Sequence, residues 1–420
     1  MPNILVISRY FPPLSSAGSS IRLVKFIKYA SKKGFFFTVF TQDISKPVIP
    51  EKMSCEFLLN EIPAEVNIKR IANPIWGKSF YKQLAQKMFG TSSIPWGIKI
   101  LIECQKFCRQ NPIDLIFVNS PPYTNVVIGY LLALLTSKPY VIDMKDDWIG
   151  TKEFFRRSPL LQKIQIFIEK KIIRRANFVI TVTNSSLERF KIRYPQFFVT
   201  EKFSIIPNGH DLEEFSHLET KDHKNKKFHL LSAASGYRPD YRDLNPFIEA
   251  LSQFIKGNSI AKEKIEIEFA GELPDERYIK LLLEILPESA LIFSENLNRN
   301  QLVSHLINAD LFFLVQPKGN TTAIAGNLYE CWATGRAPVL LFSEYGASSQ
   351  LVIDNKIGEH FHFSDLDNAS NYIERIYSGF INNQPIHISR SGVEQYDRKI
   401  LADHMMKIWS SAIDSYGDKN

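Results

Sequence analysis

The chain has 420 residues, of which 45% are hydrophobic and 23% are charged. This composition is that of a folded globular protein and excludes a disordered or collagen-like chain. Because one hydrophobic core rarely serves more than ~250–300 residues, two domains are expected. The net charge of +7 is uneven, since residues 1–210 hold 30 Lys and Arg against 14 Asp and Glu, whereas residues 211–420 hold 21 against 30. The basic first half indicates an anionic partner, such as a membrane surface, nucleic acid or a phosphorylated substrate.

The N-terminal residues and the cysteines favour a cytoplasmic protein. The chain enters the apolar run Ile4–Ile7 almost at once, without the charged region and cleavage site of a signal peptide. The longest apolar stretch, Val126–Leu135, is shorter than the ~20 residues that span a bilayer. The four cysteines show neither zinc-ligand spacing nor the density of a disulfide framework. We therefore expect reduced cysteines and a cytoplasmic chain, peripheral on the inner face of the membrane if the basic half docks there.

Short apolar runs alternate with amphipathic segments throughout the first half. The predicted strands are Asn3–Ser8, Phe36–Thr41, Asn67–Ala72, Asp114–Asn119, Tyr140–Met144, Phe178–Thr183 and Phe203–Ile206. The predicted helices between them include Ser20–Lys32, Trp96–Arg109, Leu160–Arg175 and Ser185–Tyr194. This alternation is typical of βαβ units in a parallel sheet.

The pattern starts again after a polar, Lys-rich stretch, His217–Lys227. The predicted strands that follow are Phe228–Ala233, Ile265–Ala270, Ala290–Ser294, Asp310–Val315, Pro338–Phe342 and His360–Phe363. We therefore predict two Rossmann-like, doubly wound parallel α/β domains, residues 1–215 and 216–389, that face a cleft. Residues 390–420 add a C-terminal amphipathic helix over Arg390–Tyr416. Ligands of such sheets bind beyond the carboxyl ends of the strands.

Three segments of the first domain lie at predicted carboxyl ends. The Pro-rich loop Ser8–Ser20 opens a helix whose N-terminus suits an anionic substrate, although a long connection would explain it too. The segment Asp143–Trp148 is dense in carboxylates, which can take protons, bind sugar hydroxyls or hold a metal, or else cap a helix. Ser120 begins a Ser-Pro-Pro turn on the same rim. Asp143, Asp146 and Ser120 are the candidate catalytic residues. Residues 1–209 contain no histidine, so a base there is a carboxylate or belongs to the substrate.

Two segments of the second domain suit a nucleotide diphosphate. Arg238 and Arg242 lie four apart after the first strand and could bind a diphosphate bidentately, or be solvated loop cations. A short helix that begins at Gly326 and Asn327 offers free N–H groups to a phosphate. Glu330, one turn into that helix, could accept hydrogen bonds from ribose hydroxyls. Any helix needs a start and a stop, so spacing alone leaves both interpretations open.

Together these segments resemble the GT-B fold glycosyltransferases of the glycogen-synthase-like family four, retaining enzymes that use nucleotide sugars. The resemblance covers nearly the whole chain through ILVISRYFPP, DLIFVNSPP, VIDMKDDW, ANFVITVTNSS, SIIPNGHDLEEF, EFAGE and GNLYECWATGRAPVLL. The stretch Ile206–Asp211 is the most specific of them. The order and spacing of the motifs make the resemblance strong.

The resemblance implies a donor nucleotide in the C-terminal domain and an acceptor on the N-terminal domain. It implies a diphosphate held by cations and helix N-termini without a metal, and no cofactor besides the nucleotide sugar. It places Glu330 on the ribose, Arg238 and Arg242 at the diphosphate, and Gly18 in a phosphate-contacting loop. It also implies that the last helix folds back over the first domain.

Some positions depart from the family pattern. The family's paired glutamates lie eight apart, and the partner position here is Thr322, so the donor sugar is open. Asn327 stands where many relatives carry Lys, and Lys145 stands where the family's Asp-x-Arg-Asp-x-Trp motif has Arg. Many relatives also carry a histidine base that residues 1–209 lack. A degenerate protein that binds the donor without activity is therefore one alternative.

We expect a retaining, metal-independent glycosyltransferase that acts on a surface polysaccharide or a lipid-linked glycan and docks on an anionic membrane. The cations behind the docking hypothesis are Lys78, Lys82, Lys87, Lys99, Lys106, Arg109, Lys152, Arg156, Arg157, Lys163, Lys170, Lys171, Arg174 and Arg175, with interleaved aromatic residues. Solvated basic helix faces would explain the same charges. A nucleotide-sugar epimerase on the same frame is a further alternative. No nucleic-acid-binding motif accompanies the charge, so no nucleic-acid partner is expected.

Overall fold

The computed structural model describes residues 1–14, 19–43, 55–72, 94–149, 154, 157–197, 201–215, 227–295 and 297–417. The chain forms two compact units, the first made of Met1–Pro207 with Arg398–Asn420 and the second of Asn208–Asp397. The sequence places the boundaries after residues 215 and 389, whereas the units divide after Pro207 and Asp397, eight residues away in each case. Most of the predicted Lys-rich junction lies outside the described residues.

The first unit is built on a parallel seven-stranded sheet of order β3-β2-β1-β4-β5-β6-β7. Its strands are β1 (Asn3–Ile7), β2 (Phe36–Gln42), β3 (Asn67–Ile71), β4 (Leu115–Ser120), β5 (Tyr140–Met144), β6 (Phe178–Thr181) and β7 (Phe203–Ile205). Every strand predicted for this half is present within two residues at each end. The central strands are continuous apolar runs because helices cover both faces of the sheet.

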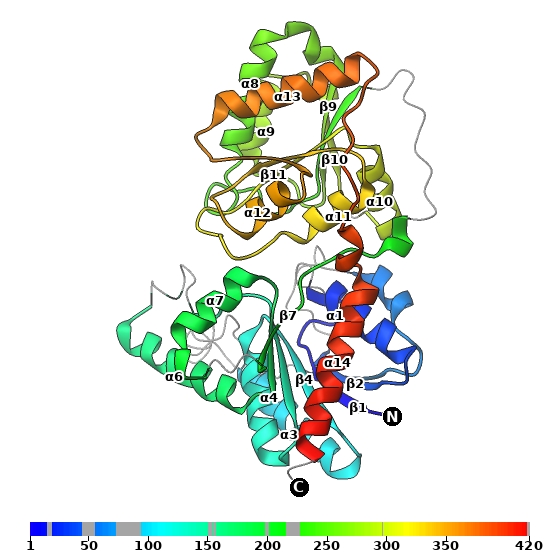
Figure 1. The fold of residues 1–420 in the computed structure, drawn as a ribbon, viewed down its shortest axis with the longest axis vertical. Coiled ribbons are helices and arrows are strands. Elements are labelled where there is room, and N and C mark those ends of the chain that lie inside the picture. The colour runs from blue at the N-terminus through cyan, green and yellow to red at the C-terminus, as the bar shows by residue number, and fades with distance from the viewer. Residues whose placement is uncertain are drawn as a thin grey trace. The chain divides into compact units, whose positions relative to one another are not determined.

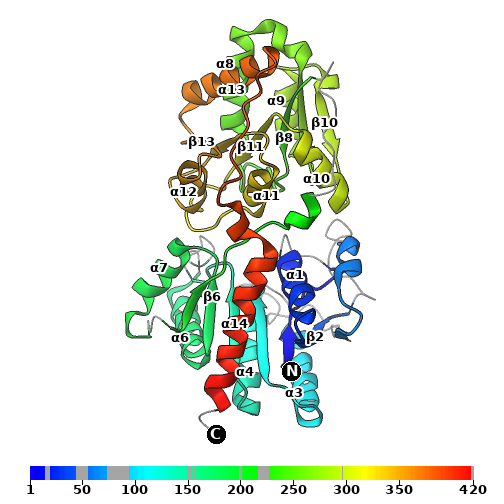
Figure 2. The ribbon, with the colours of Figure 1, turned by 45° about the vertical axis from the view of Figure 1, so that its right-hand side comes forward.

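Helices cover both faces of this sheet (Figure 1). They are α1 (Ser19–Ser31), α3 (Ile94–Gln110), α4 (Tyr123–Thr136), α6 (Pro159–Arg175), α7 (Asn184–Arg193) and α14 (Arg398–Gly417), with 3-10 turns η2 (Glu56–Glu61) and η3 (Pro195–Phe197). Helix α14 runs beside α1 in both views (Figures 1 and 2) and buries Trp409 against Phe117, with ring centroids 5.1 Å apart. Helices α3, α4 and α6 pack on the opposite face.

The last helix begins at Arg398 rather than at the predicted Arg390. Gly392 has a φ of +84°, which no residue of a right-handed helix adopts, and the 3-10 turn η7 (Val393–Tyr396) follows it. The predicted apolar stripe of the helix is otherwise present, since Leu401, Met405 and Trp409 are buried. The helix belongs to the first unit.

The second unit is built on a parallel six-stranded sheet of order β10-β9-β8-β11-β12-β13. Its strands are β8 (Phe228–Ser232), β9 (Ile265–Ala270), β10 (Leu291–Ser294), β11 (Leu311–Val315), β12 (Val339–Phe342) and β13 (Gly358–Phe361). Its helices are α8 (Asn245–Gly257), α9 (Glu276–Leu283), α10 (Arg299–Asn308), α11 (Gly326–Thr334), α12 (Ala347–Asp354) and α13 (Leu366–Ile381), with 3-10 turns η4 (Leu212–Phe215), η5 (Ser259–Lys264) and η6 (Glu288–Ala290). Helices α8 and α13 lie side by side (Figure 1).

The two sheets confirm the predicted doubly wound parallel architecture. Strand order reverses between β1 and β4 in the first sheet and between β8 and β11 in the second. Such reversals open a crevice at the carboxyl ends of the strands, where ligands of this fold class bind. No helix in the described ranges is long and apolar enough to cross a bilayer.

Candidate functional site

In the first unit, Asp143 is held in a buried ion pair at the end of β5. Arg22 of α1 donates from Nε to Asp143 Oδ2 at 2.9 Å and from Nη2 to Oδ1 at 3.1 Å. The same guanidinium donates to the main-chain oxygens of Ile206 at 2.8 Å and Pro207 at 2.5 Å. Both side chains are almost fully buried. Arg22 therefore links the segment Asp143–Trp148 to the stretch Ile206–Asp211, which carries the most specific motif of the resemblance.

A second clamp holds the other end of this motif. Arg193 of α7 binds Asp147 through two parallel hydrogen bonds of 2.9 Å. Tyr123 donates its hydroxyl to the Asp147 main-chain oxygen at 3.0 Å and stacks on Trp148 with ring centroids 5.3 Å apart. Asp146 lies between the two clamped residues and is exposed. The motif thus presents Asp146 to solvent on a segment anchored on both sides.

Lys145 and Ser120 complete this rim. Partial burial lowers the pKa of Lys145 to about 8; Asp143 and Asp146 oppose the shift and Arg22 adds to it. Ser120 is fully buried, and its hydroxyl donates to the Asp143 main-chain oxygen at 3.4 Å. Of the three candidate catalytic residues, only Asp146 presents an exposed side chain. The catalytic roles of all three stay predictions.

In the second unit, Arg242 lies at the switch point of the sheet. Its Nη1 donates to the main-chain oxygen of Val315, the last residue of β11, at 3.0 Å. No described carboxylate forms an ion pair with it, so the charge is not neutralised within the described parts of the chain. The turn that carries it needs Gly236, whose φ is +79° and where a Cβ would lie 3.0 Å from the ring of Tyr241. Arg242 is thus a half-buried cation at the place where this fold binds ligands.

The N-terminus of α11 lies in the connection that follows β11. The helix begins at Gly326 with no side-chain cap at Ala325 and no acidic residue in its first turn. A Cβ at Gly326 would meet nothing within 4 Å, so there is open space beside the first turn. The amide oxygen of Asn327 is buried, and no described residue hydrogen-bonds it. The uncapped first turn and the open space beside it fit the predicted phosphate-binding helix start, whereas the Asn327 oxygen is an acceptor and adds nothing to it.

Glu330, one turn into α11, is held by a cation that sequence reasoning missed. Arg299 lies 2.8 Å from Glu330 Oε1 through Nη2 and 2.6 Å from Glu214 Oε2 through Nε. The exposed fraction is 9% for the side chains of Arg299 and Glu330 and 12% for Glu214. Burial lowers the pKa of Arg299, but the two carboxylates raise it further, so the pKa lies above its ordinary value. Glu330 therefore has a fixed orientation.

Two predicted donor-binding residues remain, Arg238 and Gly18, and the structure describes only the first. Arg238 is exposed, lies 3.6 Å from Asp240, and shares the ring of Tyr241 with Arg242. Gly18 lies outside the described residues. Lys318, after β11, is a further cation beside this loop, 3.9 Å from Asp243, that the motifs did not indicate. The Arg22 and Arg299 pairs were missed because their partners lie far away in the sequence.

Comparison with known proteins agrees with this reading of the fold. Residues 17–214, just under half of the chain, match the family model described as Glycosyltransferase Family 4. This match confirms the predicted resemblance for the first unit. No curated protein matches the chain.

Solved structures match the whole chain at low sequence identity. Sucrose-phosphate synthase from Thermosynechococcus elongatus has a TM-score of 0.68 at 15% identity, covering 99% of this chain and 100% of that one. Anabaena HepE in complex with UDP and glucose has a TM-score of 0.63 at 16% identity, covering 98% and 100%. The α,α-trehalose 6-phosphate synthase of Burkholderia multivorans has a TM-score of 0.62 at 11% identity, covering 100% and 98%. These similarities establish the GT-B fold.

Proposed function

We propose that this chain, which has the GT-B fold and matches the Glycosyltransferase Family 4 model over residues 17–214, transfers a sugar from a nucleotide-diphosphate sugar to a surface-polysaccharide or lipid-linked glycan acceptor. The observation that carries the proposal is the switch point of the second sheet. There Arg242, in the loop after β8, forms no ion pair with a described carboxylate and reaches the end of β11 with its side chain. The uncapped N-terminus of α11 lies in the connection that follows β11. These are the groups that a departing diphosphate needs, because its developing negative charge must be stabilised.

Glu330 supports the nucleotide assignment. Its carboxylate is buried and oriented by Arg299, and a preoriented acceptor suits the hydroxyls of a ribose. HepE, one of the similar structures, binds UDP and UDP-glucose. UDP and UDP-glucose are therefore the first probes, with GDP and ADP for comparison.

We assign the acceptor to the carboxyl edge of the first sheet, where Asp146 is exposed between two clamped aspartates. An acceptor hydroxyl could give its proton to this carboxylate. Retention of configuration and independence of metal are parts of the proposal supported by the family resemblance. The lipid-diphosphate acceptor is supported by the basic first half of the chain. A lipid-linked acceptor would place the enzyme on an anionic membrane surface.

A thermal-shift titration with UDP, GDP, ADP and UDP-glucose tests the proposal, because a ligand that binds only the native state raises its apparent stability. We expect a shift with one of them, abolished by Arg242→Met and by Glu330→Ala. Arg277→Met, which removes an exposed arginine from the same unit, is the matched control and should keep the shift. No shift with any nucleotide, or an equal loss in the control, contradicts the proposal.

Activity separates the transferase from its two alternatives. Turnover of the donor without any acceptor favours an epimerase, and binding without turnover favours a degenerate protein, as Thr322 and Asn327 suggest. We expect acceptor-dependent turnover that persists in EDTA. Nuclear magnetic resonance of the product should show the anomeric configuration of the donor, and an inverted anomer would refute retention.

A further inference from the structure

Helix α6 of the first unit buries two polar residues and leaves several apolar residues exposed, although Ile172 and Ile173 of the same helix are buried. Gln165 and Glu169 are fully buried, whereas Leu160 and Phe167 keep 68% and 60% of their surface exposed. Soluble helices normally bury the apolar stripe and expose the polar one. An exposed apolar stripe on a helix of this kind calls for a partner outside the unit.

The buried polar residues of α6 have a structural explanation. Gln165 accepts a hydrogen bond of 2.8 Å from Arg157 Nη1. Glu169 accepts bonds of 3.1 Å from Arg193 Nη1 and 2.5 Å from the Tyr194 hydroxyl. These bonds account for the inward polar groups, but they do not account for the apolar residues left on the outside.

The neighbouring helices α3 and α4 also leave apolar residues exposed, although the residues that they bury are mostly apolar. Helix α4 packs against both α3 and α6. All three helices cover one face of the sheet, so the residues that they leave exposed point away from it. We call this surface the outer face. Its exposed apolar side chains are Ile98, Ile102, Leu131, Leu134, Leu135, Leu160, Ile164, Ile166 and Phe167.

The charge of the outer face is almost purely positive. The three helices contain eight Lys and Arg and only two carboxylates. Glu103 is half-buried and Glu169 is fully buried, so none of the described carboxylates of these helices is exposed. Seven of the cations are exposed: Lys99, Lys106, Arg109, Lys163, Lys170, Lys171 and Arg174. Apolar and cationic side chains are therefore interspersed without acidic residues between them.

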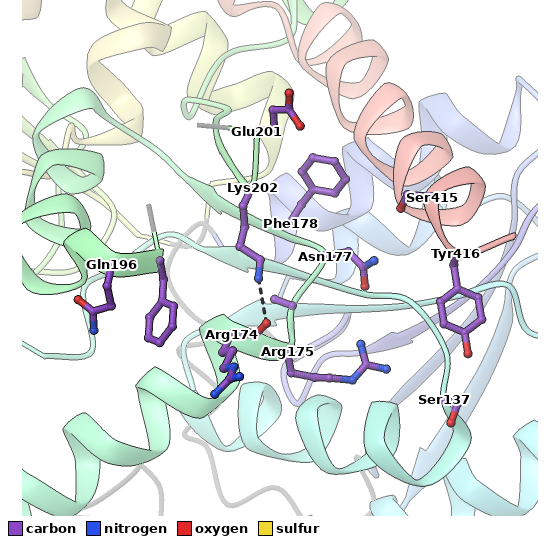
Figure 3. Close-up of a pocket in the computed structure, with 12 residues that line it drawn as sticks. Ser137, Arg174, Arg175, Asn177, Phe178, Gln196, Glu201, Lys202, Ser415 and Tyr416 are labelled. Atoms are coloured by element: carbon purple, nitrogen blue, oxygen red, sulfur yellow. Dashed lines mark hydrogen bonds between the residues drawn. The ribbon is translucent and has the colours of Figure 1, made fainter. Parts of the chain in front are cut away.

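A pocket of about 710 Å³ opens at the C-terminal end of α6 (Figure 3). Arg174, Arg175 and Lys202 line it, and Glu201 is the one carboxylate among its described lining residues. Arg175 donates to two main-chain oxygens, and Lys202 donates to the Arg174 oxygen at 2.9 Å. Main-chain oxygens carry no net charge, so these bonds do not neutralise the two cations. Burial and the nearby Arg175 both lower the pKa of Lys202. An anionic group in this pocket would relieve the crowding of cations.

We propose that the outer face of α3, α4 and α6 is the docking surface for an anionic phospholipid bilayer, and that the pocket at the end of α6 takes a lipid phosphate. Apolar side chains enter the interfacial region while lysines and arginines meet the anionic headgroups. A second copy of the chain fits worse, because two such faces would repel each other. Nucleic acid fits worse too, since a phosphate backbone offers nothing to the exposed leucine and isoleucine side chains. The choice of a membrane rests on the proposed function, in which a lipid carries the acceptor, whereas the face itself is defined by exposure and charge.

Vesicle sedimentation of the full-length protein tests the proposal. We expect the protein to sediment with phosphatidylcholine vesicles that contain phosphatidylglycerol and to stay in solution with pure phosphatidylcholine. Because each cation near an anionic surface contributes about 1 kcal/mol, Lys170→Glu with Lys171→Glu should lower the partition coefficient by about thirtyfold or more. The matched control reverses two exposed lysines of the second unit, Lys256→Glu with Lys264→Glu, and should keep binding.

A second variant and a second measurement keep the outcome interpretable. Ile164→Ser with Phe167→Ser keeps every charge of the face and should weaken sedimentation, most clearly at high salt, where electrostatic attraction is screened. The nucleotide-induced thermal shift should be unchanged in all the outer-face variants, so failure here is separable from failure of the proposed function. The proposal is overturned if the wild-type protein does not sediment with anionic vesicles, or if the control loses binding as much as the outer-face variants do. It is also overturned if the outer-face variants abolish self-association or the binding of a nucleic-acid duplex instead.

Discussion

Replacing Arg299 by methionine tests how the candidate donor site is held together. The arginine is the shared partner of Glu214 and Glu330, at 2.6 Å and 2.8 Å. Methionine keeps an unbranched apolar side chain in the space of the arginine stem but removes the charge. The two buried carboxylates would then lose the cation that they share.

The expected cost follows from the burial of the three groups. Removing one partner of a buried ion pair costs about 3–5 kcal/mol, because it leaves an uncompensated charge in a medium that solvates it poorly. The carboxylates can escape part of this cost by taking up a proton. The destabilisation of Arg299→Met should therefore be larger at pH 8 than at pH 5.

Hydrogen exchange followed by mass spectrometry measures the effect locally, which matters because a chain of two units need not unfold in one step. We expect faster exchange in peptides from α10 and α11 and no change in the first unit. Arg277→Met removes an exposed arginine paired with Asp275 and should leave exchange unchanged. Unchanged protection of α11 in Arg299→Met would refute the structural role given to this ion pair.

Three further outcomes are expected. Burial raises the pKa of Glu169 to about 7, against the opposing effect of Arg193, so the native carboxyl keeps a proton that the unfolded one loses near its ordinary pKa of 4.5. The free energy of unfolding should therefore fall as the pH rises from 4.5 to 7. Glu169→Gln should flatten that decline in thermal melts. Arg22→Met removes the ion-pair partner of Asp143 and should lower the free energy of unfolding by about 3–5 kcal/mol. In a double-mutant cycle, Asp143→Asn should restore part of that loss, and strictly additive losses would contradict the Arg22–Asp143 pair. If kcat/KM falls near pH 8 because Lys145 loses its proton, Lys145→Arg should move that fall to higher pH, since arginine stays protonated there. An unshifted pH profile would show that Lys145 does not cause the fall.

The strands could be predicted from the sequence because a parallel sheet covered on both faces leaves a strong local signal. The run Ile4–Ile7 and the run Leu311–Val315 contain only apolar residues, and both form strands. The start of the last helix was less visible, since Gly392 and a 3-10 turn replace eight residues that fit a helical pattern. The carboxyl ends of the strands, and with them the candidate site, followed from the order of the elements.

The charge pairing inside the site could not be predicted from the sequence. Arg22 and Asp143 lie 121 positions apart, and Arg299 and Glu214 lie 85 apart. No local pattern shows which arginine meets which carboxylate, so the motif residues could be named but not their partners. The buried face of helix α6 could not be predicted for the same reason. Glu169 is buried because it accepts a hydrogen bond from Arg193, which lies on another helix.

The most direct test of the central claim is the hydrogen-exchange footprint of UDP on the full-length protein. Bound diphosphate at the switch point of the second sheet should slow exchange at the first-turn amides of α11 and in the loop that carries Arg242. Arg242→Met should erase that footprint, and Arg277→Met should keep it. Protection confined to the first unit, or none at UDP concentrations that saturate a nucleotide site, would contradict the placement of the donor.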